Sequence, residues 1–330
     1  MNTISLFEPL AAELDRVERK MREPAHPEYP QLTAVLSSLL DSGGKRLRPA
    51  LALLAGRLYP TDIEKLVSLA ASVEMLHTAT LVHDDLIDGA LMRRGNATVN
   101  ARWSTGATVL TGDYLFARAA AFAAETGNVR VMSIFANTLM TICSGELRQI
   151  FDRHNVPHLV SEQAWEEALA QYDRRIHAKT ASLFAAATEA ASVLGNAPEV
   201  EQAALHAYGQ LLGTGFQIVD DVLDFQGDEE VLGKPVASDL REGIVTLPVL
   251  YFLREHPDDE RVAAVVHGKG GEDLVREVVA AIGEAGAVNK ALERARDLIG
   301  QSKAALSILP EGEARDTLDA LADYSMTRRK

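Results

Sequence analysis

Apolar residues recur at three- and four-residue intervals over long segments of this chain, and this spacing constrains its fold more than any other feature. The pattern is clearest over residues 66–88, 133–151, 181–195 and 203–225. It is typical of α-helices that bury one face, and the abundant alanine in these segments favours the same conformation. The sequence therefore predicts an all-α protein, built as a single large helical bundle of ten or more helices.

Proline and glycine mark the breaks between the expected helices. These breaks fall at residues 24–30, 43–49, 89–95, 157, 195–198, 227–235 and 268–271. The runs 129–135 and 244–253 could be strands if taken alone, but they show no regular alternation and no hairpin turn, so helix is predicted for both. No segment of low complexity divides the chain, and we expect one domain over residues 1–330.

Composition and charge exclude several classes of partner. The 330 residues are 47% hydrophobic, which is ample for a core, and the net charge of −14 disfavours nucleic acid and anionic membranes. The one cysteine, Cys143, permits no disulfide within the chain, which fits a reducing compartment. No apolar run reaches the ~18 residues of a membrane span, and the N-terminus lacks a basic start followed by an apolar run. We therefore expect no integral membrane segment, no secretory signal and a cytoplasmic location.

Two clusters of aspartate stand inside apolar helical segments. They share the spacing D-D-x-x-D and comprise Asp84, Asp85 and Asp88, then Asp220, Asp221 and Asp224. On a helix, Asp84 and Asp88 share one face, with Asp85 about 100° around the axis. Carboxylates this close repel one another unless a cation lies between them, and magnesium suits such hard oxygen ligands. A solvated helix face is the alternative, but apolar residues would not bracket such a face in both copies.

Basic residues stand close to these clusters and in two further motifs. Arginine offers forked donors to phosphate, and lysine offers a point charge. The candidates are Lys45, Arg46 and Arg48 in GGKRLRP, Arg93 and Arg94 in LMRRGNAT, Lys179 in HAKTASLF, and Lys234 in EVLGKPVASDL. The glycine pair before Lys45 is not a Walker A motif, which needs G-x-x-x-x-G-K-[ST]. Together with the acidic clusters, these residues predict a site for diphosphate groups.

These motifs together match a known family. Between about Gly43 and Pro248 the chain resembles the trans-isoprenyl diphosphate synthases, or polyprenyl synthetases. DDLIDGALMRRG is similar to the first aspartate-rich motif of the family and GTGFQIVDDVLDFQGD to the second, with GGKRLRP, HTATLVHDD and AKTASLF in the expected order. HTATLVHDD is most similar to long-chain members of the octaprenyl diphosphate synthase type. The resemblance implies a helical bundle of the isoprenoid synthase type and a homodimer.

The resemblance also implies a role for each motif. The six aspartates would bind about three magnesium ions, for which manganese can substitute, and these ions would bridge the allylic diphosphate. Arg93, Lys179 and Lys234 would contact that diphosphate; Lys45, Arg48, His77 and Arg94 would bind isopentenyl diphosphate; Thr180 and Gln217 would lie against the reacting carbons. The reaction would be ionisation, condensation and elimination, with the released diphosphate removing the proton. His83 is interpreted as a structural residue and Arg46 as a solvated neighbour.

One position departs from the family pattern, and three other functions remain as alternatives. Ile244 stands where many members carry a lysine that reaches the diphosphate. A class I terpene cyclase would not need a second diphosphate pocket, and a phosphohydrolase built on His83 and Asp84 would leave the second cluster unexplained. A non-catalytic partner subunit should have lost metal ligands, whereas all six aspartates are present.

Product length is expected to depend on the residues that precede Asp84 on its helix. Ala79 and Thr80 lie one turn upstream and are small, whereas family members that stop at fifteen carbons carry aromatic rings there. Leu76, two turns upstream, can narrow the channel. The candidates for a bulky side chain that ends elongation from a facing helix are Met132, Phe135 and Met140. We expect a product of roughly thirty carbons or more, with geranylgeranyl diphosphate, at twenty carbons, as the alternative.

Overall fold

A computed structural model of the chain describes residues 6–23, 30–41, 43–93, 95–226 and 236–327. Its contacts group the chain into two compact units. The first unit comprises Met1–Leu139, Leu183–Gly209 and Ala305–Leu321, and the second comprises Met140–Ser182, Gln210–Ala304 and Ala322–Lys330. Both units are helical, which confirms the all-α class. The single domain over residues 1–330 stays a prediction.

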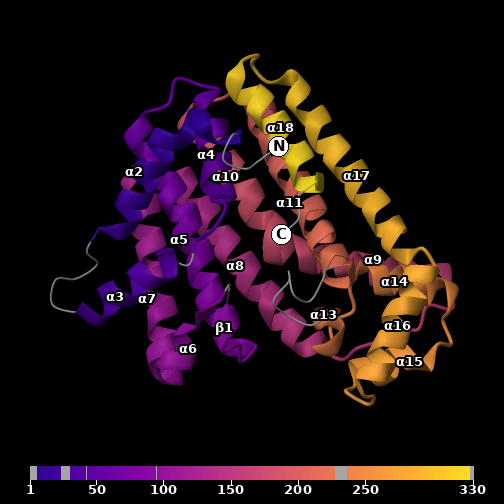
Figure 1. Ribbon diagram of the computed structural model, residues 1–330. Helices are drawn as coiled ribbons and strands as arrows, with labels where there is room; N and C mark the ends of the chain where they lie inside the picture. The colour runs from indigo at the N-terminus through magenta and orange to yellow at the C-terminus, as the bar shows by residue number, and fades with distance from the viewer. Residues whose placement is uncertain (1–5, 24–29, 42, 94, 227–235, 328–330) are drawn as a thin grey trace. The chain divides into compact units, whose positions relative to one another are not determined.

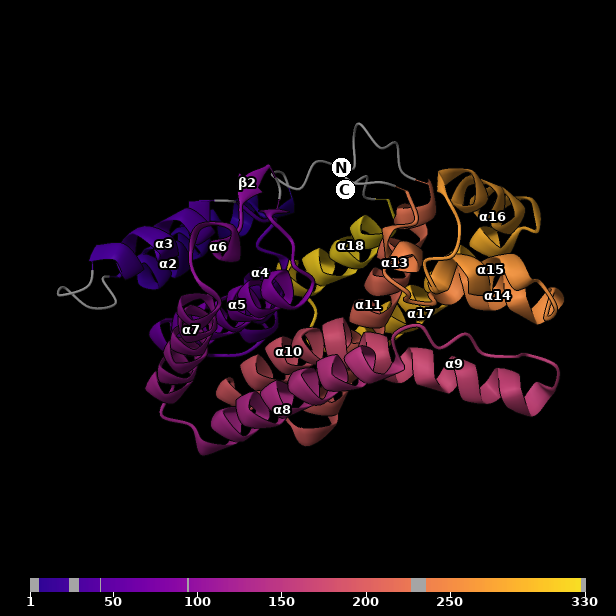
Figure 2. The ribbon, with the colours of Figure 1, turned by 90° about the horizontal axis from the view of Figure 1, so that it is seen from below.

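Helix α5 (Ile63–Ile87) lies at the centre of the first unit. Apolar residues surround its whole circumference, and every residue from Leu66 to Leu76 is buried. Such a helix needs partners on all sides. It packs against α2 (Ala11–Arg22), α4 (Leu47–Arg57) and α7 (Thr105–Glu125), as Figure 1 and Figure 2 show. The unit also contains η1 (Glu8–Leu10), α3 (Pro30–Asp41), α6 (Val99–Arg102), η3 (Leu306–Ile308), and parts of α8 (Val129–Asp152), α10 (Ser182–Leu194), α11 (Glu199–Gln226) and α18 (Glu313–Thr327).

Local hydrogen bonds define both ends of α5. At its start, the Asp62 side chain accepts a 2.9 Å hydrogen bond from the backbone N–H of Glu64. At its end, the N–H of Asp88 donates to the Asp84 carbonyl at 2.8 Å, and Gly89 takes a left-handed φ of 65°. Glycine adopts this conformation without strain and is the common residue just past a helix. The first aspartate cluster therefore occupies the last turn of a core helix and its cap.

The composition of α5 also resembles that of a membrane span. It is the one helix in the described part of the chain that is long and apolar enough to cross a membrane. However, 78% of its most apolar window is buried inside the protein, as expected of a helix at the centre of a core.

A short hairpin follows α5 and carries Arg93. Its strands, β1 (Met92–Arg93) and β2 (Asn96–Ala97), pair antiparallel with Arg93 opposite Asn96. Gly95, at φ 77°, lies between the two strands. The sequence does not predict this hairpin, because two-residue strands are too short to show an alternating pattern.

Arg46 forms ion pairs, so the expectation of a solvated residue was wrong. Its guanidinium donates to Glu18 and, at 2.8 Å, to the buried carboxylate of Glu74. It also donates to the Leu40 carbonyl at 3.1 Å. The sequence gives no sign of these pairs, because each acidic partner lies 28 residues from Arg46 and is brought to it only by packing.

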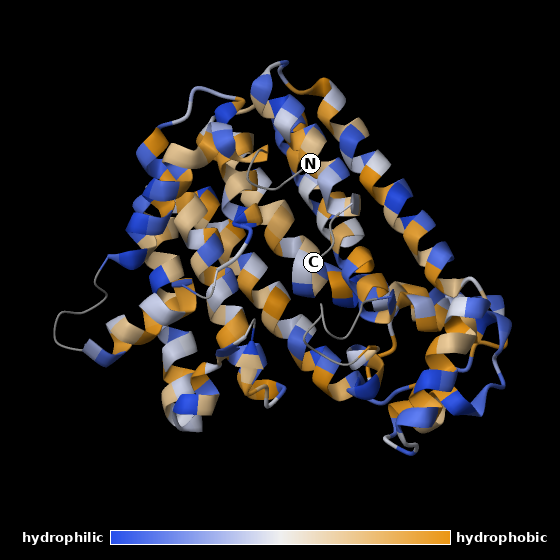
Figure 3. Cartoon of the chain, viewed as in Figure 1, coloured by the Kyte–Doolittle hydropathy of each residue, from blue (hydrophilic) through white to orange (hydrophobic). Residues whose placement is uncertain are grey.

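The second unit is built around one apolar core. Tyr172, Phe252 and Ile282 are among its buried residues. Blue and orange alternate in Figure 3 along α17 (Ala287–Ala305), as expected of an amphipathic helix. The elements that lie wholly or mainly in this unit are α9 (Glu162–Ile176), η2 (His177–Ala181), α13 (Ser238–Arg241), α14 (Leu247–Glu255), α15 (Glu260–Val266), α16 (Glu272–Glu284) and α17 (Ala287–Ala305), together with the larger parts of α8 and α11. The strand-like runs noted in the sequence fall in α8 and at the start of α14, so their prediction as helix is confirmed over 129–135 and 247–253.

The segment η2 is a π-helix that joins α9 to α10 and carries Lys179 and Thr180. Helix α8 comes very close to it at Gly145, where a Cβ would lie 2.3 Å from the Cβ of Ala178. A residue larger than glycine at this position would force the two segments apart. Single-turn π-helices are frequent at functional sites because they re-aim the side chains they carry.

Candidate active site

The first aspartate cluster combines a buried carboxylate with two that solvent reaches. Asp85 is 5% exposed, and its Oδ1 accepts a 2.7 Å hydrogen bond from the Nε–H of Arg93. Burial raises the pKa of Asp85, the Arg93 charge opposes this shift, and Asp88 adds to it. Asp84 is half-buried and Asp88 is exposed. The middle aspartate is therefore bound to the protein, while its two neighbours lie at the surface of the first unit.

The second cluster, on α11 in the second unit, also has a buried middle aspartate, but here the third aspartate, Asp224, is buried as well. Asp221 is 4% exposed; its Oδ2 accepts a 2.7 Å hydrogen bond from the Tyr172 hydroxyl and its Oδ1 a 2.9 Å bond from the Gln217 amide. Burial and the charge of Asp239 raise the pKa of Asp221 to about 7, against the opposing effect of these two hydrogen bonds. Asp220 is half-buried.

Asp224 connects the second cluster to α13. Its Oδ1 accepts a 2.6 Å hydrogen bond from the Ser238 hydroxyl, and its Oδ2 accepts a 3.1 Å bond from the N–H of Asp239. The Asp224 carbonyl also accepts a 2.8 Å bond from the N–H of Ala237. These contacts hold the start of α13 against the end of α11.

The donor chemistry of both clusters fits magnesium. Asp84 and Asp88 offer hard carboxylate oxygens four residues apart, and Asp220 and Asp224 repeat the spacing. Within the ranges that the structure describes, no three acidic, histidine or cysteine side chains are grouped so as to hold a metal ion by themselves. Magnesium usually keeps several waters and takes phosphate oxygens as further ligands, so a protein site with few carboxylates suits it.

The structure brings Thr180 and Gln217 together, in line with their shared predicted role. The Thr180 hydroxyl donates a 2.6 Å hydrogen bond to Oε1 of Gln217. The Lys179 ammonium lies 3.7 Å from the Glu146 carboxylate on α8. Sequence reasoning missed Tyr172 and Glu146, because no local pattern marks them and their partners are distant in the chain.

Three of the residues predicted to bind isopentenyl diphosphate lie in the first unit. Lys45, Arg48 and His77 are all half-buried there. The Arg48 guanidinium lies 5.1 Å from the centre of the Phe184 ring, a cation–π contact that orients it. The positions of Arg94 and Lys234 lie outside the described residues. Ile244, the residue that departs from the family pattern, is half-buried, and its N–H donates to the Asp239 carbonyl at 2.8 Å.

Leu76 lines a small apolar cavity of about 20 Å³ among α5, α8 and α10. Of the three bulky residues considered on α8, which were Met132, Phe135 and Met140, Phe135 lines this cavity. Ala79 is fully buried, and the Thr80 hydroxyl donates to the helix backbone at the His77 carbonyl, 2.7 Å away. The α5 face that borders the cavity continues through Thr80 to Asp84.

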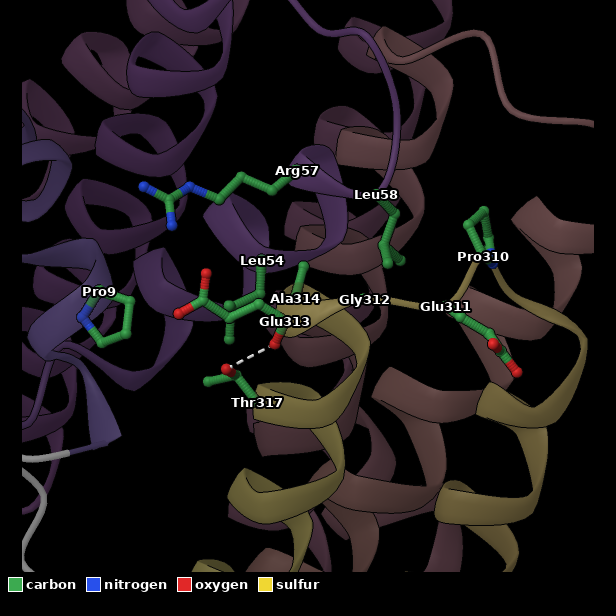
Figure 4. Close-up of a pocket in the computed structure, with 10 residues that line it drawn as sticks. All are labelled: Pro9, Leu54, Arg57, Leu58, Pro310, Glu311, Gly312, Glu313, Ala314 and Thr317. Carbon is green, nitrogen blue, oxygen red and sulfur yellow. Dashed lines mark hydrogen bonds between the residues drawn. The ribbon is translucent and has the colours of Figure 1, made fainter.

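Two larger hollows also lie in the first unit. One, of about 290 Å³, lies beside the end of α4 and the start of α18, where the Thr317 hydroxyl bonds to the Glu313 carbonyl (Figure 4). None of the predicted site residues lines it. The other, of about 320 Å³, has Asp85 and Arg93 in its wall together with residues of α3. Of these two hollows, the second adjoins a predicted cluster.

His83 packs between helices, in agreement with its interpretation as a structural residue. Its ring lies 5.0 Å from that of Phe116, and Nε2 lies 3.3 Å from the Val109 carbonyl. A Cβ at Gly112 would come within 2.3 Å of the ring. His83 thus fills a notch in α7 that only glycine leaves open.

The chain is similar along almost its whole length to known proteins. The family model described as Polyprenyl synthetase matches residues 29–282. Heptaprenyl diphosphate synthase component 2 of Geobacillus stearothermophilus is 39% identical over 98% of both chains, and octaprenyl diphosphate synthase of Haemophilus influenzae is 34% identical over 96% of this chain and 94% of the relative. A crystal structure of polyprenyl synthase from Caulobacter crescentus CB15, complexed with calcium and isoprenyl diphosphate, has a TM-score of 0.88 at 34% identity and covers 100% of this chain and 98% of that one.

Proposed function

Because this chain belongs to the polyprenyl synthetase family, we propose that it condenses isopentenyl diphosphate with an allylic diphosphate and repeats the step to a medium- or long-chain all-trans product. It is a prenyltransferase, and its family uses these two substrates. The observation that carries the proposal is the pair of D-D-x-x-D clusters, each with its middle aspartate held by protein donors. One such cluster is compatible with many metal sites, whereas two, with basic residues in four other motifs, suit a reaction between two diphosphates.

Magnesium is the proposed cofactor, at about three ions per site, with manganese as a substitute. When bound, it would neutralise the charge that develops on the departing diphosphate. Asp84, Asp88 and Asp220 would supply direct ligands, because solvent reaches them. Asp85, Asp221 and Asp224, which are buried, would also contribute to binding the ions. The calcium and isoprenyl diphosphate in the Caulobacter crescentus structure support a site of this chemistry.

Two sets of basic side chains would each bind one of the two diphosphates. The residues proposed for the allylic diphosphate are Arg93, Lys179 and Lys234. The residues proposed for isopentenyl diphosphate are Lys45, Arg48, His77 and Arg94. Binding both substrates at once makes the condensation effectively unimolecular, which lowers its barrier. The Thr180 and Gln217 dipoles would stabilise the allylic cation, and the released diphosphate would remove the proton, so no protein base is assigned.

The proposed product has roughly thirty carbons or more, because the face of α5 below Asp84 carries small residues. Ala79 and Thr80 leave room for a tail that runs toward Leu76. A twenty-carbon product is the second candidate. It is favoured by the small cavity beside Leu76 and Phe135, which at about 20 Å³ has room for about one water molecule. A longer tail would have to displace these side chains.

We also propose a homodimer in the cytoplasm. Exposed residues with small or apolar side chains recur on one face of α7 at Leu110, Ala117, Ala121 and Ala124, and Val129 beyond its end is 86% exposed. A face of this kind suits a second copy of the chain, because its burial removes apolar surface from water. Light scattering on the purified chain would test this, and a monomer at micromolar concentration would contradict it.

The deciding experiment is incubation of the purified chain with isopentenyl diphosphate, an allylic diphosphate and magnesium, followed by mass analysis of the products. A ladder of prenyl diphosphates spaced by one isoprene unit is expected. A cyclic hydrocarbon formed from the allylic substrate alone would identify a terpene cyclase. The absence of any product would indicate that the chain needs another subunit, a relevant outcome because the Geobacillus stearothermophilus relative is named as a component.

A further inference from the structure

The Thr180 hydroxyl is one end of a chain of hydrogen bonds whose other end is Tyr172, in the core of the second unit. Thr180 donates to Gln217 at 2.6 Å, Gln217 donates to Asp221 at 2.9 Å, and Tyr172 donates to Asp221 at 2.7 Å. The three elements involved are η2, α11 and α9. We call this set of four residues the relay.

The chemistry of Asp221 sets the direction of every hydrogen bond in the relay. The amide NH₂ of Gln217 donates to Oδ1 of Asp221 and the Tyr172 hydroxyl donates to Oδ2, so both carboxyl oxygens of Asp221 act as acceptors in the relay. The carbonyl oxygen Oε1 of Gln217 must then face Thr180. Because this oxygen is also an acceptor, the Thr180 hydroxyl must donate its single proton to Gln217. The Thr180 oxygen is left with lone pairs and without a proton to present on its other side.

Tyr172 is the inner anchor of the relay. Its side chain is 1% exposed, and the Arg175 guanidinium lies 5.4 Å from the centre of its ring. Without the phenolic hydroxyl, Oδ2 of the buried Asp221 would lose its donor, and an unsatisfied buried acceptor is costly. The carboxylate would then turn to find another donor, and Gln217 would lose the fixed partner that orients its amide.

We propose that Tyr172 is a positioning residue which, through Asp221 and Gln217, keeps the lone pairs of the Thr180 oxygen turned toward the reacting carbons. The inference rests on the proposed function, in which Thr180 lies beside the allylic cation. The negative end of the hydroxyl dipole then faces the positive charge as it develops, and no reorientation is needed in the transition state. A rotated hydroxyl would present its proton instead and would repel the cation.

A double-mutant cycle on Tyr172 and Thr180 tests the proposal. The measurement is the single-turnover rate of the first condensation, with a fifteen-carbon allylic diphosphate, saturating isopentenyl diphosphate and magnesium. Tyr172→Phe removes one hydroxyl and should lower this rate about tenfold while the KM of each substrate changes less than twofold, because the loss is confined to the transition state. Thr180→Val removes the hydroxyl that the relay orients.

The coupling between the two changes is the decisive quantity. In the Thr180→Val background, Tyr172→Phe should have almost no further effect, because there is no hydroxyl left to orient. In the Thr180→Ser background, which keeps the hydroxyl, Tyr172→Phe should again cost about tenfold. Equal losses from Tyr172→Phe in all three backgrounds, or no loss in the parent chain, would overturn the proposal.

Tyr208 provides a matched control for the loss of a buried hydroxyl. It is fully buried in the first unit and donates a 2.7 Å hydrogen bond to the Leu318 carbonyl. Tyr208→Phe should lower the melting temperature as much as Tyr172→Phe does, but leave the condensation rate unchanged. An equal loss of rate in both variants would assign the effect to stability and contradict the proposal. A parent chain that forms no product even when a second subunit is supplied would instead reject the proposed function.

Discussion

Arg93 on β1 and Asp85 on α5 form a hydrogen-bonded ion pair with an N–O distance of 2.7 Å. The pair ties the hairpin that carries Arg93 to the last turn of the central helix. Asp85, the middle aspartate of the first cluster, therefore holds the Arg93 guanidinium in place.

The Asp85→Asn variant should therefore impair binding of the allylic substrate. The amide keeps the shape of the side chain but loses the charge that holds Arg93, so the KM for the allylic diphosphate should rise about tenfold, the cost of one charge-assisted hydrogen bond. The KM for isopentenyl diphosphate should change much less. Glu162→Gln, which weakens the exposed pair with Arg254, is the control and should leave both constants unchanged. An equal rise in both constants would show that the pair does not serve one substrate.

Activity should depend strictly on magnesium or manganese. Asp84→Ala and Asp220→Ala should each lower kcat by orders of magnitude, roughly a thousandfold, with the helical circular dichroism intact. Asp297→Ala removes an exposed carboxylate from α17 and should have no effect. Full activity in excess chelator would contradict the proposed cofactor.

The two basic residues of the GGKRLRP motif should affect one substrate selectively. Lys45→Ala and Arg48→Ala should each raise the KM for isopentenyl diphosphate about tenfold or more, and the KM for the allylic substrate much less, because each removes a cation from one proposed pocket. Lys65→Ala, at an exposed position on α5, is the control. A change confined to the allylic substrate would show that the two pockets are assigned the wrong way round.

Product length should respond in opposite directions to two substitutions. Ala79→Phe places a ring one turn below Asp84 and should shorten the product to fifteen or twenty carbons. Phe135→Ala enlarges the cavity beside Leu76 and should lengthen it by at least one isoprene unit. Mass analysis of the products would show both shifts. If Ala79→Phe leaves the ladder unchanged, the tail does not run past this position.

Arg46 should matter for stability and not for substrate binding. Arg46→Ala would leave the Glu74 carboxylate buried without its main partner, at a cost of about 3 kcal/mol in the free energy of unfolding. Urea unfolding would measure this loss, and Arg296→Ala, at an exposed position on α17, should change the stability by less than about 0.5 kcal/mol. A stable Arg46→Ala protein with a raised KM would instead place Arg46 in a substrate pocket.

The sequence was sufficient to predict the helices and the clusters, because both depend on local spacing. The periodicity over 66–88 corresponds to most of α5, and the break that begins at Gly89 is where the helix ends. The family membership followed from short motifs, and the comparisons confirm it.

The sequence did not predict features that depend on packing between distant segments. Tyr172 meets Asp221 across 49 residues, and Thr180 meets Gln217 across 37. The sequence of η2 does not predict a π-helix, because the same residues are equally compatible with an ordinary α-helix. The difference in environment between Asp84 and Asp85 is likewise set by neighbours outside the motif.

Helix α5 lies at the centre of the core of the first unit and also carries the first aspartate cluster at its end. A change of side-chain size along its lower face therefore alters the space for the growing tail and the packing of the core at the same time. Because Leu76 is buried and lines the cavity, a single change of size there is expected to alter product length and to cost stability together. The physical expectation is compensated pairs, in which a larger residue at position 76 arises together with a smaller one at 135, so the two positions should covary among relatives that differ in product length.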